Sequence, residues 1–441
     1  MWNFETDPDF QRKLDWITHF VREEIEPLDY LFPKDETYNT RNEALMTIMA
    51  PLKQQVRAQG LWACHLPPAL GGGGWGQLEL ALMNEILGRS FFAPTIFGTA
   101  APDTGNAEIL AHFGNPAQKA RFLQPLLDGD IVSCFSMTEP QGGADPNVFT
   151  CRAEQDGKGW VLRGEKWFAS NARWAEFLIV MAVTDTTVPI HRGASMFIVP
   201  TNTPGVRTIR NAGMAFEQPE HGAHAYLAFD DVRLTDADLL GQPGEAFKIA
   251  QTRLGGGRVH HAMRTVGLAR RAFEAVCERA QSRQTQGTLL AQKQMVQDTI
   301  AELWLSIEQF RLLVLQTAWK IDRYQDYNRV RGDIAAAKIL SERVMVEAAS
   351  KAIHLHGALG VSNEMLFGEW LLWGHALGLA DGPTEVHKIT LAKQLLRASP
   401  AAVDGFPSQH VPAGAARAAR KYAAALQLPG HRRGWVGTGS D

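Results

Sequence analysis

The sequence predicts an α+β protein in which a small β domain is inserted between two helical domains. Apolar residues recur with a helical period over residues 1–130 and again over 243–398, whereas 131–242 consists of short β-branched and aromatic runs separated by Gly, Pro and Asn. Residues 399–441 are rich in Ala, Gly and Arg, and we expect an appended tail with one short helix near 412–426. A chain of 441 residues is long enough for several domains around a large core.

The N-terminal region opens with the amphipathic stretch DPDFQRKLDWITHFVREEIEPLD. Asp7 followed by Pro8 is a typical helix start. Apolar residues then recur at helical spacing, which places one stripe at Phe10, Leu14, Ile17, Phe20, Val21 and Ile25. Further helices are expected at 42–59, 76–89, 104–113 and 116–127, interrupted by the irregular stretch LPPALGGGGWG.

The middle region predicts a barrel or a sandwich of short strands. The expected strands are IVSCFSMTE, GWVLRGEKWFAS, EFLIVMAV, GASMFIVP and GAHAYLAFDDVRL. After residue 243 the helical period returns, and we expect long helices at 246–285, 289–324 and 328–357 and a last one at 384–397.

The composition narrows the class of function. A net charge of −3 gives no reason to expect nucleic acid or an anionic membrane as partner. The four cysteines are widely spaced, which favours free thiols in a reducing compartment. The start of the chain, MWNFETDPDFQRKLDW, lacks the apolar run of a signal peptide, and the sequence holds no apolar run long enough to span a membrane. We therefore expect a cytoplasmic protein.

Two strand ends carry polar groups beside aromatic ones. SCFSMTEPQGGAD ends a strand at Met137 and Thr138, and GEKWFASNA directs Trp167 and Phe168 to opposite faces. Exposed hydroxyl and backbone N–H groups in such places can bind a heterocycle or a phosphate. Ordinary strand ends with a core aromatic pair explain the same residues, so the residues alone leave both interpretations open.

The stretch RLGGGRVHHAMR, residues 253–264, concentrates positive charge beside three glycines. It lacks the fixed spacing of a phosphate-binding glycine loop. His260 and His261 point about 100° apart on a helix, and HLH at 354–356 also has poor spacing for two ligands, so we expect no metal site.

The stretch ADGPTEVHK near the C-terminal end of the helical region has two interpretations. Asp381 or Gly382 can cap the following helix, Pro383 suits its first turn, and Glu385 complements its dipole. Asp381 can equally accept a proton from a substrate. Arg283, in the connection SRQTQGTLLAQKQ, can pair with a phosphate or remain solvated.

Taken in order, these motifs resemble the acyl-CoA dehydrogenase family of flavoproteins over roughly residues 10–398. SMTEPQGGAD is similar to the family pattern V-T-E-P-G-A-G-S-D, and GEKWFAS is similar to G-x-K-x-W-I-T-N. The Asp381 turn stands where the family has Y-E-G-T. The resemblance implies an α+β fold with an N-terminal helical domain, a middle β-barrel domain and a C-terminal four-helix bundle, and a homodimer or homotetramer in which a neighbouring subunit completes each FAD site.

The resemblance also assigns roles to individual residues. It implies FAD contacts at Phe135, Met137, Thr138, Gly143, Ala144, Phe168, Ser170, Arg283, Gln294, His354, Ala358, Thr384 and Glu385. It implies substrate contacts at Ala144, Arg258, His261, Arg264 and Gly382. Asp381 matches the catalytic base, which takes the α-proton of an acyl-CoA thioester while the β-hydride passes to flavin N5. An electron-transfer flavoprotein is then the expected electron acceptor.

Departures from the family pattern refine this expectation. Asp381 replaces a glutamate that is one methylene longer, Gln286 replaces a phenylalanine, and Gly257 occupies the alternative base position of some members. The stretches at 253–267 and 380–388 look most like a subgroup that contains the dehydrogenase domains of human acyl-CoA dehydrogenase family members ten and eleven. We therefore expect His260, His261 or Arg264 to bind a 4-hydroxy- or 4-phospho-acyl chain.

Two other classes of function stay open on the sequence. A flavin oxidase or monooxygenase of the same superfamily, such as a nitroalkane-oxidase-like enzyme, also uses an aspartate base. A non-catalytic acyl-CoA-binding protein is the third interpretation, which the presence of Thr138, Ser170, Arg258, Arg283 and Asp381 together disfavours.

Overall fold

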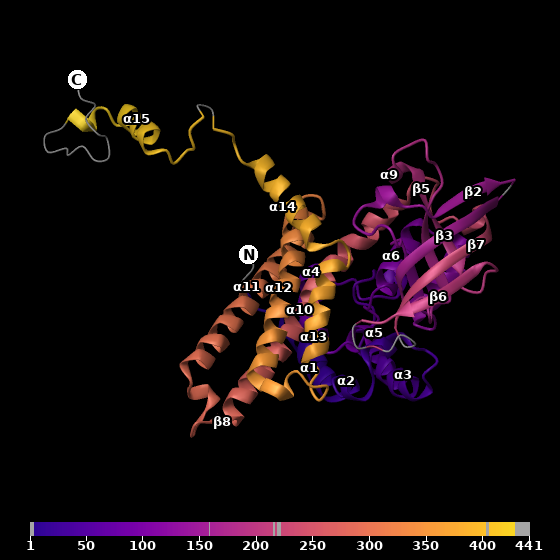
Figure 1. The fold of residues 1–441 in the computed structure, drawn as a ribbon, viewed down its shortest axis with the longest axis horizontal. Helices are drawn as coiled ribbons and strands as arrows, with labels where there is room; N and C mark the ends of the chain where they lie inside the picture. Colours follow the sequence, from indigo (N-terminus) through magenta and orange to yellow (C-terminus); the bar gives the residue numbers. More distant parts are fainter. Residues whose placement is uncertain (1–3, 158, 215–216, 218–221, 403–404, 428–441) are drawn as a thin grey trace. The chain divides into compact units, whose positions relative to one another are not determined.

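The computed structural model describes residues 4–157, 159–214, 217, 222–402 and 405–427. The chain divides into two compact units, Met1–Ile389 and Thr390–Asp441. The first unit contains helices, then a sheet, then helices again, which confirms the predicted fold class (Figure 1).

The N-terminal helices begin where the sequence predicts. Asp7 caps the first helix by accepting hydrogen bonds from the backbone N–H groups of Asp9 and Phe10, and Leu14, Ile17 and Phe20 are buried. The helices are α1 (Pro8–Phe20), α2 (Leu28–Leu31), α3 (Glu43–Ala58), α4 (Gln77–Leu87), α5 (Ala93–Ile96), α6 (Asp103–Phe113), α7 (Pro116–Gln118) and α8 (Gln124–Asp128).

The middle region forms one seven-stranded sheet with the order β1-β4-β2-β3-β7-β6 and with β5 paired to β4. The strands are β1 (Ser133–Ser136), β2 (Arg152–Asp156), β3 (Gly159–Ser170), β4 (Phe177–Val183), β5 (Ala194–Pro200), β6 (Val206–Ala212) and β7 (His224–Thr235). A short helix, α9 (Ile190–Gly193), precedes β5. Strands β1 and β4 are parallel, whereas β3 and β7 form a long antiparallel pair.

Strands β2 and β6 escaped the sequence prediction because their side chains are mostly exposed. β2 reads RAEQD and β6 reads VRTIRNA, so neither shows an apolar alternation. Both pair instead with the long strands β3 and β7, whose backbone hydrogen bonds hold them in the sheet.

The continuous apolar run of β4 has a simple cause, namely burial on both faces of the sheet. Phe177, Ile179 and Met181 pack into the core of the N-terminal helices, while Leu178 and Val180 pack into the core between the strands. A strand loses the alternation of apolar and polar residues when both faces of its sheet are buried.

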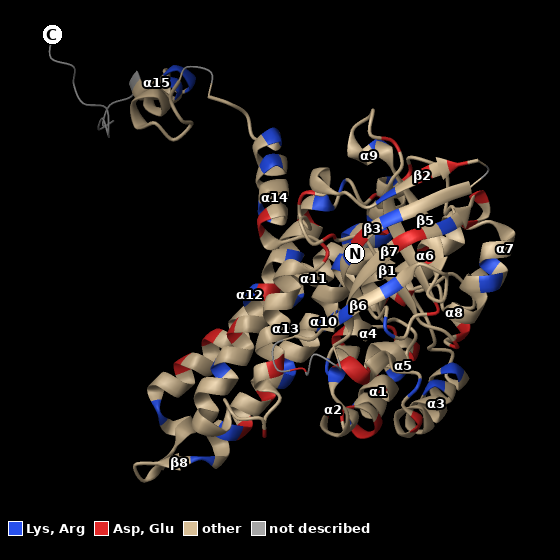
Figure 2. Ribbon diagram, turned by 45° about the vertical axis from the view of Figure 1, so that its right-hand side comes forward, with Lys and Arg blue, Asp and Glu red and all other residues tan. Residues whose placement is uncertain are grey.

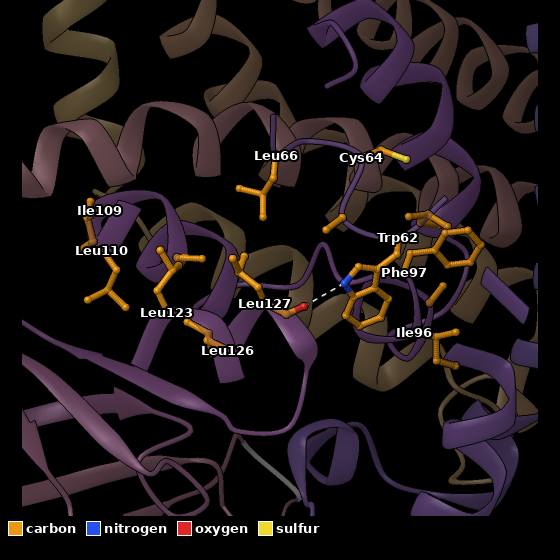
Figure 3. Packing of buried hydrophobic residues seen from close by; sticks show 14 of the residues in the cluster. Trp62, Cys64, Leu66, Ile96, Phe97, Ile109, Leu110, Leu123, Leu126 and Leu127 are labelled. Carbon is orange, nitrogen blue, oxygen red and sulfur yellow. Dashed lines mark hydrogen bonds between the residues drawn. The ribbon is translucent and has the colours of Figure 1, made fainter. Parts of the chain in front are cut away.

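Trp62 anchors the N-terminal core (Figure 3). Its indole N–H donates to the carbonyl oxygen of Leu127 at 3.0 Å, and the Arg57 guanidinium lies 3.7 Å from the centre of a Trp62 ring. The ring therefore joins the segment before α4 to the end of α8.

The C-terminal region is a four-helix bundle, and Figure 1 shows its helices side by side. The helices are α10 (Ala246–Ser282), α11 (Gln294–Tyr324), α12 (Arg331–His356) and α13 (Phe367–Leu379), followed by α14 (Thr384–Ala398). A two-stranded hairpin of β8 (Gln284–Thr285) and β9 (Thr288–Leu289) joins α10 to α11. Figure 2 shows acidic and basic residues interspersed along the bundle.

Helix α13 was not among the predicted helices. Its sequence, FGEWLLWGHALGL, contains three glycines and little polar periodicity. The structure explains two of these glycines, because a Cβ atom at Gly374 would lie 2.8 Å from the Val346 side chain and one at Gly378 would lie 2.3 Å from the Glu342 carboxyl group. Glycine has a low helix propensity, so close packing against α12 stabilises α13 where its own sequence does not.

In the second unit, α15 (Val411–Lys421) lies within the tail, where a short helix was expected. Across the described residues, no helix is both long enough and apolar enough to cross a membrane.

Glycines also allow α4 and α10 to touch. A Cβ atom at Gly267 would lie 1.9 Å from the Glu85 carbonyl oxygen, so Gly267→Ala must push the helices apart. We expect it to lower the free energy of unfolding by about 1–3 kcal/mol in urea denaturation. Gly368→Ala is the control, since a Cβ there meets nothing within 4 Å. Equal unfolding midpoints for Gly267→Ala and wild type would contradict this packing.

Candidate active site

Asp381 lies in the tight turn between α13 and α14. Its backbone is left-handed with φ of 56°, and the following Gly382 has φ of 100°. Its carboxyl oxygen Oδ2 lies 3.6 Å from His261 Nε2 on α10, and a Cβ atom at Gly257 would lie 3.5 Å from the same oxygen. Arg258 Nε donates to the Asp381 carbonyl oxygen at 2.9 Å. The carboxyl group therefore faces α10.

The helix-cap interpretation of Asp381 finds little support in this geometry. Within the described part of the chain, no hydrogen bond links its carboxyl group to a backbone amide of α14, where Val386 N and His387 N donate instead to the Pro383 carbonyl oxygen. The acid is consequently available for chemistry.

Helix α12 holds this turn from the other side. Lys338 is 1% exposed and its ammonium donates to the Leu377 carbonyl oxygen at the end of α13. One helical turn later, Glu342 accepts a 2.5 Å hydrogen bond from the Thr384 hydroxyl at the start of α14. Both flanks of the Asp381 turn are thereby fixed to one rigid helix.

The groups around Asp381 are positively charged or neutral. Burial lowers the pKa of His261 to about 4, so this imidazole is neutral at pH 7. Burial lowers the pKa of Lys338 to about 8, which leaves it mostly charged at pH 7. Burial and the nearby Arg258 lower the pKa of His387 to about 4. Arg258 and Lys338 thus supply the positive charge beside the acid.

A second group of predicted residues gathers where β1 and β3 end. Trp167 N donates to the Thr138 carbonyl oxygen at 2.9 Å, which joins the loop after β1 to the end of β3. Phe168 has φ of 50° and is 54% exposed, with its ring 4.9 Å from that of Trp167. The Ser170 hydroxyl lies 2.9 Å from His224 Nδ1.

An ion pair lies beneath these strand ends. The Lys166 ammonium and the Glu139 carboxylate are 2.8 Å apart and both side chains are fully buried. Lys166 also donates to the Met137 carbonyl oxygen at 2.8 Å, while Glu139 accepts from the backbone N–H of Thr150 and of Cys151.

Arg253 on α10 connects the two groups of residues. Its guanidinium lies 4.1 Å from the centre of the Phe135 ring, and its Nε donates to Asn106 Oδ1 at 2.9 Å. Burial lowers its pKa, and the negative charge of Asp381 opposes that shift. The end of β1 and the Asp381 turn therefore flank the same section of α10.

Other predicted residues lie nearby in different settings. Gly143 and Ala144 are in the exposed loop after Thr138. Thr384 is buried and its hydroxyl is engaged by Glu342 and Gly378, whereas Glu385 is exposed.

Arg264 and His260 face away from Asp381. Arg264 Nε donates to Asn84 Oδ1 at 3.0 Å and its NH2 group donates to the Thr99 carbonyl oxygen at 2.8 Å, so its guanidinium is already engaged. The His260 ring lies 6.2 Å from that of His65. The sequence predicts that His260, His261 or Arg264 of α10 binds a polar acyl chain. Of these three, His261 alone lies beside Asp381 in the described residues.

Four residues that are predicted to contact FAD lie away from this site. Arg283 follows α10, and a rise of about 1.5 Å per residue places it roughly 30 Å from His261. Gln294, His354 and Ala358 are exposed, near the hairpin end of the bundle. Their contact with a cofactor stays a prediction that needs a second subunit.

Sequence analysis missed Arg253, Lys338, Glu342 and His224. Lys338 and Glu342 carry a readable signal, since they are charged residues four positions apart within the small and apolar sequence IAAAKILSE. His224 has no such signal, because its partner Ser170 is identified only by the pairing of β3 with β7.

The chain matches a known family over most of its length. Models of the N-terminal, middle and C-terminal domains of acyl-CoA dehydrogenase match residues 8–130, 134–232 and 244–396. "Acyl-CoA dehydrogenase family member 11" of Gallus gallus is 40% identical over 351 residues, which cover 78% of this chain and 45% of that protein. The chain thus spans about half the length of the curated relatives it first matches.

Two mycobacterial proteins are similar over more of their own length. "Probable acyl-CoA dehydrogenase FadE2" of Mycobacterium tuberculosis is 39% identical over 350 residues, which cover 78% of this chain and 85% of that protein. The solved "Structure of a putative acyl-CoA dehydrogenase from Mycobacterium abscessus" has a TM-score of 0.83 and 35% identity, and the match covers 90% of this chain and 100% of that one.

The buried ion pair between Lys166 and Glu139 leads to a prediction about the stability of the protein. Lys166→Met leaves the Glu139 carboxylate buried without its partner, and we expect the free energy of unfolding to fall by about 3–5 kcal/mol. Adding Glu139→Gln should recover part of the loss, because no charge then remains buried. The control is Arg207→Met, which removes an exposed pair with Asp230 and should cost less than about 1 kcal/mol. Similar losses for Lys166→Met and Arg207→Met in urea denaturation would refute the interpretation.

Proposed function

Because the chain belongs to the acyl-CoA dehydrogenase family, we propose that it catalyses FAD-dependent α,β-dehydrogenation of an acyl-CoA thioester to the 2-enoyl-CoA. The observation that supports this most directly is the Asp381 carboxyl group, held on a left-handed turn toward α10 with Arg258 and Lys338 beside it. A positioned carboxylate of this kind can take the weakly acidic α-proton of a thioester.

The residues at the strand ends fit a flavin. Phe168 presents an exposed aromatic ring, and the Ser170 hydroxyl and the backbone near Thr138 offer polar atoms beside it. The buried indole N–H of Trp167 has no hydrogen-bond partner among the described residues, as expected where a ligand's acceptor atom is to be met. Bound there, FAD would supply the acceptor for the substrate's β-hydride.

The chain's own groups account for the remaining steps. Asp381 accepts the α-proton, and by the resemblance its backbone N–H helps to bind the thioester carbonyl, where negative charge develops. Arg258 keeps the turn in place through its bond to the Asp381 carbonyl oxygen. Lys338 and Glu342 hold the turn's two flanks to α12, which limits the movement of the base.

The partners of this reaction are part of the same proposal. An electron-transfer flavoprotein would reoxidise the flavin, and a homodimer or homotetramer would bring Arg283, Gln294, His354 and Ala358 of one subunit to the FAD of another. Their exposure at the hairpin end of the bundle supports such a contribution.

A flavin oxidase or monooxygenase is the second candidate, because an aspartate base suits nitroalkane-oxidase-like chemistry. Reduced flavin that reoxidises rapidly in air, without an electron-transfer flavoprotein, would favour it. A preparation that binds no FAD even after its addition would favour the third candidate, a non-catalytic acyl-CoA-binding protein.

Anaerobic titration with butyryl- and octanoyl-CoA tests the role of Asp381. We expect wild type to lose the long-wavelength absorption of oxidised flavin, and Asp381→Asn to do so at least about 100-fold more slowly. Asparagine tolerates the left-handed backbone, so the turn should persist. Glu364→Gln, an exposed acid before α13, is the control. Equal bleaching rates for wild type and Asp381→Asn would remove Asp381 from the mechanism.

We further propose that the acyl chain carries a 4-hydroxy or 4-phospho group, which His261 meets. The supporting observation is a half-buried imidazole 3.6 Å from the base, in a position where a simple acyl chain needs no polar group. His261→Leu should lower kcat/KM for 4-phosphovaleryl-CoA at least about tenfold more than for valeryl-CoA, the loss expected for one unmade buried hydrogen bond. Arg264→Met is the comparison, and it should affect both substrates alike because Asn84 and Thr99 already engage Arg264. An unchanged ratio in His261→Leu would contradict the polar-chain proposal.

A further inference from the structure

Ser170 has a partner on the neighbouring strand. Ser170 ends β3, His224 begins β7, and the two residues are direct partners in the antiparallel register. The Ser170 hydroxyl oxygen and His224 Nδ1 are 2.9 Å apart, which is hydrogen-bond distance. The backbone pairing fixes this contact, so it does not depend on a flexible side chain reaching across the sheet.

The His224 ring is neutral in its surroundings. Burial lowers its pKa. Among the described residues, the charged groups that face it are Glu217 and Lys34, and these form a 2.9 Å ion pair with each other. On its other side the His224 ring centre lies 6.3 Å from that of Phe168. A neutral imidazole has one donor nitrogen and one acceptor nitrogen, and either can be Nδ1.

The Ser170 hydroxyl carries a single proton, so it can donate to only one partner at a time. It can also accept a hydrogen bond on its oxygen. The direction of its bond to His224 therefore determines whether the hydroxyl donates to a ligand or accepts from it.

We propose that His224 is a positioning residue that lets Ser170 hydrogen-bond to FAD in both the oxidised and the reduced state. This inference rests on the proposed function, because it assumes that Ser170 contacts the flavin near N5. It goes beyond that function by assigning the direction of the contact to a histidine that acts through Ser170.

The argument follows from the hydrogen-bonding capacity of the flavin. Oxidised flavin offers a lone pair at N5, so Ser170 must donate to it, and His224 Nδ1–H then donates to the Ser170 oxygen. Toward a reduced flavin, which would carry a hydrogen at N5, the Ser170 oxygen would accept a hydrogen bond and the hydroxyl proton would turn to an unprotonated His224 Nδ1. The two imidazole tautomers hold the same number of protons. Their exchange needs only solvent at the half-buried ring and leaves the net charge unchanged.

Removing the imidazole should therefore penalise the reduced flavin specifically. In His224→Phe the oxidised flavin still receives the Ser170 proton, but with reduced flavin that proton has no acceptor on the chain. We expect affinity for reduced FAD to fall about tenfold relative to oxidised FAD, which for a two-electron couple lowers the midpoint potential by about 30 mV. The measurement is the midpoint potential of the FAD-loaded full chain, with the affinity of the apoprotein for oxidised FAD as second readout.

Three variants isolate the effect. His224→Leu removes the same nitrogens with a different shape, which preserves the test if His224→Phe fails to fold. His224→Gln restores an acceptor and a donor and should keep the wild-type potential. Tyr226→Phe changes the next residue on the same face of β7, where the phenol contacts Glu165, and should leave the potential unchanged.

Ser170→Ala separates failure of this inference from failure of the proposed function. If Ser170→Ala lowers the affinity for oxidised FAD and both His224→Phe and His224→Leu leave the midpoint potential unchanged, His224 has no positioning role while the flavin contact of Ser170 stands. If FAD binds but neither Ser170→Ala nor the His224 variants alter its potential or affinity, the placement of Ser170 at the flavin is itself wrong. Under the proposal His224 acts only through Ser170, so adding His224→Phe to Ser170→Ala should change neither the potential nor the affinity further. A double variant that matches Ser170→Ala supports the proposal, and a further shift in the double variant contradicts it.

Discussion

The fully buried ion pair between Lys166 and Glu139 is the constraint on which the sheet side of the site depends. A buried pair of charges contributes little net stability, yet leaving one of them without its partner is costly. Each group here has several bonds to satisfy, namely Met137 O for the ammonium and the Thr150 and Cys151 amides for the carboxylate. The observed arrangement of the loop after β1 and the end of β3 satisfies them all. Thr138 therefore lies at the same edge as Phe168 and Ser170 although it is distant from both in sequence.

Helix α10 provides the complementary rigid element. Its first half carries Arg253, Arg258 and His261 past the end of β1 and the Asp381 turn, and its second half ends at Arg283 far from both. A single ligand on one chain cannot reach the two ends of so long a helix. The length of α10 therefore gives a physical reason for the proposed role of a neighbouring subunit: predicted cofactor contacts that are too far apart in one chain can meet when a second bundle supplies the distant ones.

Sequence patterns predict those parts of this molecule in which chemistry is local. Asp7 and Pro8 start a helix by their own hydrogen bonding and ring geometry, and β4 is apolar throughout because both of its faces are buried. Strand β6 and helix α13 are stabilised mainly by the elements packed against them, so their own sequences do not predict their secondary structure. The same division holds at the site. The order of the motifs predicts roles for Asp381 and Ser170, whereas the residues that contact or support them, Lys338 and His224, become visible only when α12 and β7 are placed beside them.

Backbone strain adds a last argument about Asp381. A left-handed conformation costs a residue with a side chain about 1–2 kcal/mol, and Asp tolerates it better than most. Phe168 also adopts it, although an aromatic residue has no local reason to do so. Six other non-glycine residues of the described structure also have positive φ, Ala63 and Asp231 among them, so this conformation alone does not mark the site. At the predicted base and at a predicted flavin contact it coincides with support from buried charged groups, namely Lys338 and the Lys166–Glu139 pair. A shorter acid in place of glutamate demands more exact placement of the backbone, and the bonds from Arg258, Lys338 and Glu342 supply that placement.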